Sequence, residues 1–137
     1  MQVTKIILAD DDAEDRAIIQ EAMELLGAGD IIMFAENGEE LLDMLQTRFT
    51  ELTCPCLIVL DLNMPKMNGT QTLSRLKGDK NFNHIPVIIY STSINPLEKQ
   101  KCLSLGAHSF ITKPVSFNES KQIAQSFLRL CQVKKVV

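Results

Sequence analysis

The sequence predicts an α/β fold in which five parallel strands form a doubly wound sheet with helices on both faces. Short apolar runs alternate five times with longer segments whose apolar residues recur at steps of three and four, the spacing of an amphipathic helix. Three of the short runs are almost continuously apolar, as expected for strands that helices cover on both sides. Strands and helices in alternation favour parallel strands joined by right-handed crossovers.

Five segments have the length and composition of strands. In chain order they are Lys5–Ala9, Ile31–Ala35, Leu57–Leu60, Val87–Tyr90 and His108–Thr112. The first, third and fourth are the almost continuously apolar ones, so we expect both faces of these strands to be covered.

The segments between the strands show helical patterns. In the first of them, the apolar side chains at helical spacing are Ala17, Ile18, Ala22, Leu25 and Leu26. Asp12 is well placed to cap this helix, with Asp15 three residues on, and Gly27 to end it. The other helices are predicted at Gly38–Phe49, Gly69–Lys77, Pro96–Leu105 and Ser116–Cys131.

The length and composition are those of one folded domain. Of the 137 residues, 45% are apolar and 23% are charged, which is typical of a globular domain and unlike a disordered chain. We expect a single domain over residues 1–137, with no output domain. The sequence has no apolar run near the roughly 20 residues of a membrane span and no signal-peptide pattern, so we expect a cytoplasmic protein that does not act at a membrane.

The cysteines show no paired spacing that indicates a metal site or a disulfide framework. They are Cys54, Cys56, Cys102 and Cys131. Because nothing in the sequence indicates secretion either, we interpret all four as reduced thiols.

Charge is distributed unevenly along the chain. The net charge is −3, but residues 1–65 contain 14 acidic and three basic side chains, whereas residues 66–137 contain three acidic and 11 basic ones. The acidic half is consistent either with an acidic site or with a solvated face. The basic half has neither interleaved aromatic residues nor a recognition-helix pattern, so nucleic-acid binding is not predicted.

Polar residues follow four of the predicted strands, where an open parallel sheet binds its ligands. Asp10, Asp11 and Asp12 follow the first strand, and Asp61 follows the third. Several carboxylates with a backbone carbonyl form a hard-oxygen site that suits Mg²⁺. The alternative for the triplet is that Asp12, or Asp11 as well, caps the following helix.

The other strand ends carry residues suited to phosphoryl chemistry. A carboxylate at Asp61, beside a cation, can attack a phosphoryl group and form an acyl phosphate. Ser91 follows the fourth strand with a hydroxyl group that can hold a phosphoryl oxygen, and Lys113 follows the fifth with a positive charge. Singly, Ser91 is typical of a turn and Lys113 of a solvated surface, but together at the strand ends they favour a functional site.

On these residues the chain resembles the receiver domain of two-component response regulators, over Lys5 to Leu130. The matching segments are Ile7–Asp11, Val59–Pro65 with Met67–Gly69, Pro86–Ser91, and Gly106–Ala107 with Phe110–Pro114. The resemblance implies a flavodoxin-like sheet in the order 2-1-3-4-5. It also implies a stand-alone signalling switch that takes its phosphoryl group from a histidine kinase or a histidine phosphotransfer protein.

The resemblance assigns the acceptor and the metal ligands. Asp61 is the expected phospho-acceptor. Asp10, Asp11 and Asp61, with the backbone carbonyl of Asn63, would hold Mg²⁺, for which Mn²⁺ can substitute. Such a domain is not an enzyme in the usual sense, but it assists its own aspartyl phosphorylation and dephosphorylation.

The resemblance also assigns the switch. Ser91 and Lys113 would act on the phosphoryl group, and Ser91 and Phe110 take the two switch positions, where Thr and Tyr are commoner. Phe110 is equally well explained as an ordinary core aromatic. An output protein of unknown identity would dock on the face formed by the fourth helix, the fifth strand and the fifth helix. In this family the peptide bond between Lys113 and Pro114 is commonly cis.

Three other classes of function fit the sequence less well. A phosphatase of the haloacid dehalogenase kind needs a second Asp two residues after its nucleophile, and Asn63 at that position cannot transfer a proton. A flavodoxin-like nucleotide binder needs a phosphate loop after the first strand, where the aspartates of this chain would repel an anion. A docking module without phosphorylation would have no use for the full set of acids, hydroxyl and lysine.

Overall fold

All five predicted strands form in the computed structural model, which describes residues 4–50 and 53–131. They are β1 (Ile6–Ala9), β2 (Ile32–Ala35), β3 (Leu57–Leu60), β4 (Val87–Ser91) and β5 (Ser109–Thr112). The strands lie parallel in the order β2-β1-β3-β4-β5. This confirms the predicted sheet and places the reversal of strand order between β1 and β3, where such folds bind their ligands.

Each predicted helix is present, and an oxygen atom of a side chain caps every one. The helices are α1 (Ala13–Leu25), α2 (Gly38–Arg48), α3 (Gly69–Lys77), α4 (Pro96–Ser104) and α5 (Phe117–Leu130), with a short 3-10 helix η1 (Gly29–Ile31) before β2. Their capping residues are Asp12, Asn37, Asn68, Asn95 and Ser116, all residue types that accept hydrogen bonds from the free N–H groups of a first turn. In the described ranges, none of these helices combines the length and the apolar character needed to cross a bilayer.

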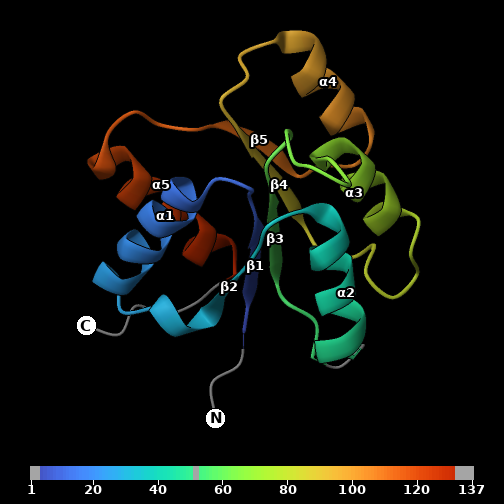
Figure 1. Ribbon diagram of the computed structural model, residues 1–137, viewed down its shortest axis with the longest axis horizontal. Helices are drawn as coiled ribbons and strands as arrows, with labels where there is room; N and C mark the ends of the chain where they lie inside the picture. Colours follow the sequence, from blue (N-terminus) through green and yellow to red (C-terminus); the bar gives the residue numbers. More distant parts are fainter. Residues whose placement is uncertain (1–3, 51–52, 132–137) are drawn as a thin grey trace.

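The helices form two layers, with α1 and α5 on one face of the sheet and α2, α3 and α4 on the other (Figure 1). Successive side chains of a strand point to opposite faces. Ile7 therefore shares an apolar cluster with Leu73 of α3, and the next residue, Leu8, shares a second cluster with Phe127 of α5. The two cores hold the sheet rigidly and leave its carboxyl edge free to carry polar groups.

The interpretation of the four cysteines as reduced thiols was wrong for two of them. Cys56 and Cys131 form a disulfide, with their Cα atoms 5.5 Å apart. The pair is separated by 75 residues, and local spacing cannot reveal it because the sheet topology brings the end of α5 beside the start of β3. Outside this disulfide, Cys102 is buried and Cys54 is half-buried.

Candidate functional site

Two buried aspartates lie side by side at the carboxyl edge of the sheet. Asp10 directly follows β1 and Asp61 directly follows β3, and the register that pairs Ala9 with Leu60 brings both carboxylates to the same level. The backbone N–H of Asp61 donates to the carbonyl of Ala9 at 2.9 Å, which continues the ladder between the strands up to the site. Asp10 is fully buried and Asp61 is 7% exposed.

The exposed carboxylate of Asp11 completes a cluster of three acids. One oxygen from each of Asp10, Asp11 and Asp61 lies within 4.8 Å of the others. Asp10 Oδ2 is buried and lies 2.7 Å from the Lys113 ammonium. Hard oxygen donors of this kind suit Mg²⁺ and Mn²⁺, and the residues present therefore fit the expected cation.

Asn63 also reaches this cluster. Its backbone N–H donates a hydrogen bond to the Asp61 carboxylate, an interaction that lowers the pKa of Asp61. The loop that leaves β3 therefore wraps around the end of the acceptor side chain. The role of the Asn63 carbonyl as a metal ligand stays a prediction.

The cap of α1 is a different residue of the acidic triplet from the two that belong to the acid cluster. Asp12 has extended backbone angles, and its Oδ1 accepts hydrogen bonds from the N–H groups of Glu14 and Asp15 at 2.8 and 3.4 Å. Asp12 is therefore the cap of α1, and the capping alternative holds for this residue only. Asp11 is left with a carboxylate that points into the acid cluster.

Lys113 lies among three carboxylates. Its Nζ is 2.7 Å from Oδ2 of Asp10, 2.7 Å from Oδ2 of Asp15 and 3.6 Å from Oδ2 of Asp61. The side chain is 8% exposed, and its ammonium lies 5.6 Å from the centre of the Tyr90 ring. The peptide bond to Pro114 is trans, since no peptide bond among the described residues is cis. The contact with Asp15 was not expected from the sequence.

Burial and the lysine shift the pKa values of the site in opposite directions. Burial raises the pKa of Asp61 to about 6, with Lys113 opposing the shift and the neighbouring acids adding to it. Burial also raises the pKa of Asp10, again against Lys113. For Lys113 itself, burial lowers the pKa, but Asp10 and Asp15 outweigh it, so the pKa rises above its ordinary value. The cation-free site thus holds more negative charge than one lysine can offset.

The two proposed switch residues lie on adjacent strands. Ser91 is buried at the end of β4, where its Oγ accepts a hydrogen bond from the N–H of Ser93 at 3.1 Å. Phe110 of β5 is half-buried and pairs with Ile89. It lines a hollow of about 290 Å³ beside the start of α4. Phe110 therefore packs against the apolar core and also borders this hollow, and the switch roles stay predictions.

Residues outside the predicted set also support the site. Arg16 Nη1 donates to the carbonyl of Asp10 at 2.6 Å, and Arg16 Nη2 lies 3.6 Å from Glu36, so α1 holds the end of β1 by a charged hydrogen bond. Gly69 begins α3, and a Cβ atom there would collide with the carbonyl of Asp61 and with Leu62. A helical pattern in the sequence shows that Arg16 and Asp15 are on α1, but it does not show which strand end they face.

Comparison with known proteins gives a consistent result. The family model of the response regulator receiver domain matches residues 6–125. The chain is 29% identical over 121 residues to the probable methanogenesis regulatory protein FilR2 of Methanothrix harundinacea, which covers 88% of this chain and 78% of FilR2. It is 30% identical over 110 residues to a chemotaxis protein CheY homolog of Campylobacter jejuni, with 80% of this chain and 81% of that protein covered.

Solved structures agree with the sequence relatives. The chain superimposes on the phosphorylated cyanobacterial phytochrome response regulator RcpA with a TM-score of 0.82 and 30% identity, over 95% of this chain and 94% of RcpA. The Mn²⁺-bound form of the response regulator Rcp1 gives a TM-score of 0.78 and 25% identity, over 97% of this chain and 99% of Rcp1.

Proposed function

The chain belongs to the response regulator receiver domain family, and on this basis we propose that it is a phosphorylation-dependent signalling switch with Asp61 as its phospho-acceptor. A histidine kinase or a histidine phosphotransfer protein would supply the phosphoryl group, in the cytoplasm. The observation that carries the proposal is the meeting of Asp10, Asp11 and Asp61 with Lys113 at the strand ends. That arrangement pairs a nucleophile with donors for a divalent cation and with a fixed positive charge.

The chemistry is a single phosphoryl transfer. An oxygen atom of the Asp61 carboxylate forms a bond to phosphorus while the phosphorus–nitrogen bond of a phosphohistidine breaks. The electron pair of that bond stays on the imidazole. Lys113 and the hydroxyl of Ser91 would hold the oxygens of the transferred group. Hydrolysis of the acyl phosphate, assisted by the same residues, would return the switch to its initial state.

The proposed cation is Mg²⁺, with Mn²⁺ as a substitute, held by the side chains of Asp10, Asp11 and Asp61 and by the carbonyl of Asn63. When bound, it supplies positive charge that offsets the repulsion between the carboxylates and an incoming phosphoryl group. The Mn²⁺-bound form of the similar regulator Rcp1 supports this assignment.

Acetyl phosphate and Mg²⁺ are expected to add one phosphoryl group to the native chain and none to Asp61→Asn, as measured by the intact mass of the protein. Excess EDTA is expected to abolish labelling because the uncompensated carboxylates repel the donor. Asp43→Asn, which changes an exposed acid of α2, is the matched control and should be labelled like the native chain. Labelling of Asp61→Asn to the native extent would refute the assignment.

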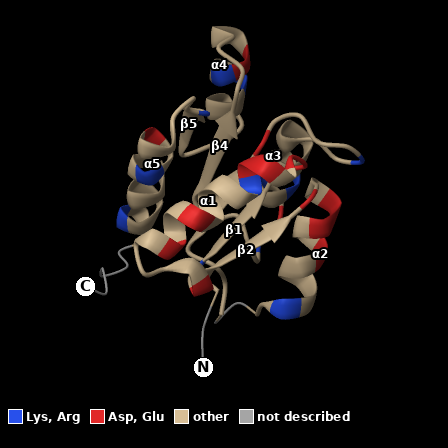
Figure 2. Ribbon diagram, turned by 60° about the vertical axis from the view of Figure 1, so that its left-hand side comes forward, with Lys and Arg blue, Asp and Glu red and all other residues tan. Residues whose placement is uncertain are grey.

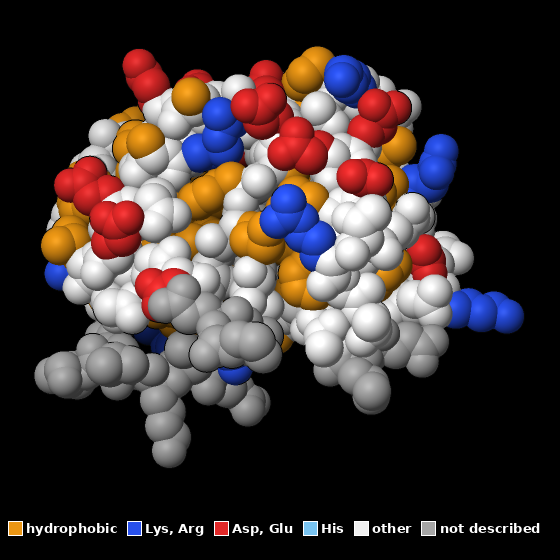
Figure 3. All heavy atoms as spheres, turned by 60° about the horizontal axis from the view of Figure 1, so that its bottom comes forward, with side chains coloured by type: hydrophobic (Ala, Val, Ile, Leu, Met, Phe, Trp, Pro, Cys, Tyr) orange, Lys and Arg blue, Asp and Glu red, His pale blue; other side chains and the backbone are white. Residues whose placement is uncertain are grey.

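The output surface is proposed to be the face of α4, β5 and α5. On α4 and the loop before it, Ile94 and Leu97 are 86% and 73% exposed. Lys99 lines the hollow beside Phe110, so a change in packing at Phe110 would alter this surface directly. Figure 2 shows acidic residues along α1, and basic residues together with acidic ones on α4 and α5. The face in Figure 3 also carries both signs interspersed. We propose that the partner presents an acidic, partly apolar surface to this face.

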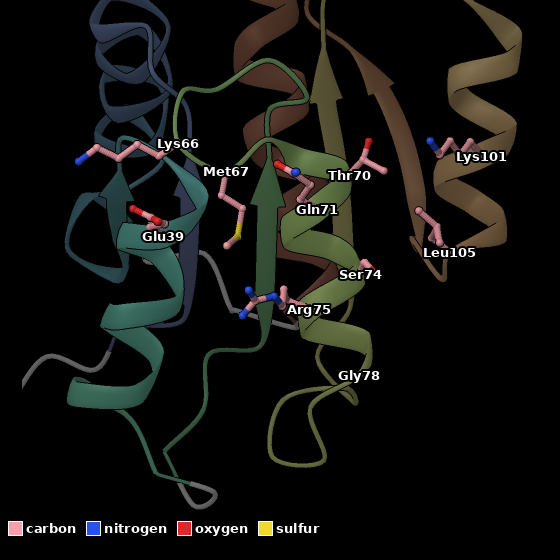
Figure 4. A pocket seen from close by; sticks show the side chains of 10 residues that line it. All are labelled: Glu39, Lys66, Met67, Thr70, Gln71, Ser74, Arg75, Gly78, Lys101 and Leu105. Carbon is pink, nitrogen blue, oxygen red and sulfur yellow. The ribbon is translucent and has the colours of Figure 1, made fainter.

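One lysine of α4 is a control within the same helix. Lys101 lies on the side that faces α3, where it lines a different hollow together with Thr70 and Leu105 (Figure 4). The sequence by itself does not distinguish Lys101 from Lys99, since both are basic residues of one helix. The proposed docking face therefore includes Lys99, together with Lys121 and Arg129 of α5, but not Lys101.

Charge reversal at Lys99 is expected to weaken binding of an amphipathic peptide with an acidic polar face by about five- to tenfold at low salt, because one favourable pair becomes repulsive. The effect should shrink as salt rises above physiological strength, where the Debye length is ~8 Å. Affinities of the phosphorylated chain are to be measured across a salt series. Lys101→Glu should change them less than twofold. Equal effects of the two variants would place the docking surface elsewhere.

A further inference from the structure

The ammonium of Lys113 is held by a helix that the proposed chemistry does not otherwise use. Lys113 Nζ donates a hydrogen bond to Asp15 Oδ2 at 2.7 Å, across a sequence separation of 98 residues. The acceptor Asp61 is farther from the same nitrogen, at 3.6 Å. The shortest contacts of Lys113 therefore draw it toward α1 and β1, away from the residue that receives the phosphoryl group.

Asp15 is fixed in this position by the start of its own helix. Its backbone N–H donates to the capping side chain of Asp12, so the residue belongs to the first turn of α1 and its side chain reaches over the strand ends. The Asp15 side chain is 31% exposed, against 1% for Asp10. Asp15 is not part of the acid cluster of Asp10, Asp11 and Asp61. Asp15 reaches the site through its hydrogen bond to Lys113, and its charge also acts on Asp10.

The position of Lys113 affects a cation and an anion in opposite ways. A lysine whose charge is offset by Asp15 repels a nearby divalent cation less than a free lysine does. The same offset weakens the attraction of Lys113 for a phosphoryl group on Asp61, because Lys113 must leave Asp15 or share its protons with it. Whichever residue holds Lys113 therefore sets the balance between the two ligands.

We propose that Asp15 is a positioning residue that holds the Lys113 ammonium away from Asp61, and thereby favours cation binding over phosphoryl binding in the resting protein. The inference rests on the proposed function, since it assigns Lys113 to the phosphoryl group. Phosphorylation would then move Lys113 from Asp15 toward Asp61 and release the first turn of α1 from β5.

The test compares two probes on four proteins: the native chain, Asp15→Asn, Asp15→Glu and Glu14→Gln. One probe is Mg²⁺ alone. The other is beryllium fluoride at saturating Mg²⁺, which mimics a phosphoryl group bound to a carboxylate. Asp15→Asn is expected to weaken Mg²⁺ binding and to strengthen beryllium fluoride binding, each by about two- to fivefold, the range of one partly exposed ion pair. Asp15→Glu keeps the charge and should restore most of both affinities.

The controls separate positioning from simpler effects. Glu14→Gln removes an exposed charge from the same first turn and should shift either affinity less than twofold. In a Lys113→Met background, Asp15→Asn should also change Mg²⁺ affinity less than twofold, since the residue through which it acts is gone.

Several results would overturn the inference. If Asp15 has a merely structural role, Asp15→Asn will weaken the binding of both probes together. If the effect is one of general charge, Glu14→Gln will change both affinities as much as Asp15→Asn does. An undiminished effect of Asp15→Asn without Lys113 would exclude action through the lysine. Failure of the native chain to bind beryllium fluoride or to become labelled on Asp61 would refute the proposed function instead, and the Mg²⁺ titrations with and without Lys113 would still decide the role of Asp15.

Discussion

Replacing Lys113 with methionine is expected to destabilise the cation-free protein by about 3 to 5 kcal/mol at pH 7, the usual cost of removing one partner from a buried charge pair. Lys113 is 8% exposed and lies within 4 Å of Asp10, Asp15 and Asp61. Without it, Asp10 and Asp61 remain buried and charged with no cation to offset them. Methionine fills a similar volume, so the loss of stability reports the removal of the charge and not the formation of a cavity.

The loss is expected to depend on pH and on Mg²⁺. The pKa of Asp61 is already raised to about 6, and removing Lys113 removes an interaction that lowers it. An acid with a raised pKa in the folded state binds protons more tightly there than when unfolded, so stability increases as pH falls through that pKa. Destabilisation should therefore be smaller at pH 5 than at pH 8, and smaller again with Mg²⁺.

Urea unfolding in EDTA at several pH values, repeated with Mg²⁺, measures these effects. Lys101→Met, which removes an exposed lysine of α4, is the control and should stay within about 0.5 kcal/mol of the native chain. A loss below about 1 kcal/mol for Lys113→Met, or one equal at all pH values, would mean that the buried carboxylates do not depend on this lysine.

Replacing Gly69 with alanine is expected to destabilise the protein by about 1 to 3 kcal/mol and to weaken Mg²⁺ binding at least tenfold. Alanine in a helix is ordinarily more stable than glycine by roughly 1 kcal/mol, so the sign is opposite to the usual one. The reason is packing, because the added methyl group would overlap the carbonyl of Asp61 and the backbone of Leu62. Relieving that overlap moves α3 or the end of β3, and overpacking carries a cost of this size.

Gly78 at the other end of α3 provides the matched control. A Cβ atom there would have the carbonyl of Ser74 as its nearest neighbour, at 3.4 Å, and the backbone of Gly78 is right-handed helical. Gly78→Ala should therefore leave stability and Mg²⁺ affinity near their native values. Urea unfolding and Mg²⁺ titration of both variants check the prediction. An unchanged Mg²⁺ affinity in Gly69→Ala would show that the close approach of α3 does not position Asp61.

Much of the site could be predicted from the sequence, because in a parallel sheet the residue that follows each strand has a known place. Asp10, Asp61 and Lys113 each directly follow a strand, and all the strands point the same way, so their last residues must meet at one edge. Helix capping was equally local: Asp12 needed only the start of α1 to be recognised as its cap.

Contacts between distant segments were not predictable in this way. The Cys56–Cys131 disulfide depends on where the end of α5 lies against the sheet, and the orientation of Lys101 toward α3 depends on how α4 is rotated about its axis. Both are set by packing of whole elements, and a pattern within one element contains no information on them.

The sequence by itself determined the fold class, the strand order through the family resemblance, and the residues at the edge of the sheet, because apolar periodicity and helix caps are local properties of the chain. Only the tertiary structure decided which carboxylates share Lys113. Asp15 and Lys113 are 98 residues apart, and the distances of 2.7 and 3.6 Å that favour Asp15 over Asp61 arise from the packing of α1 against the sheet. An ion pair depends on the separation of two atoms, which the folded arrangement of whole elements sets.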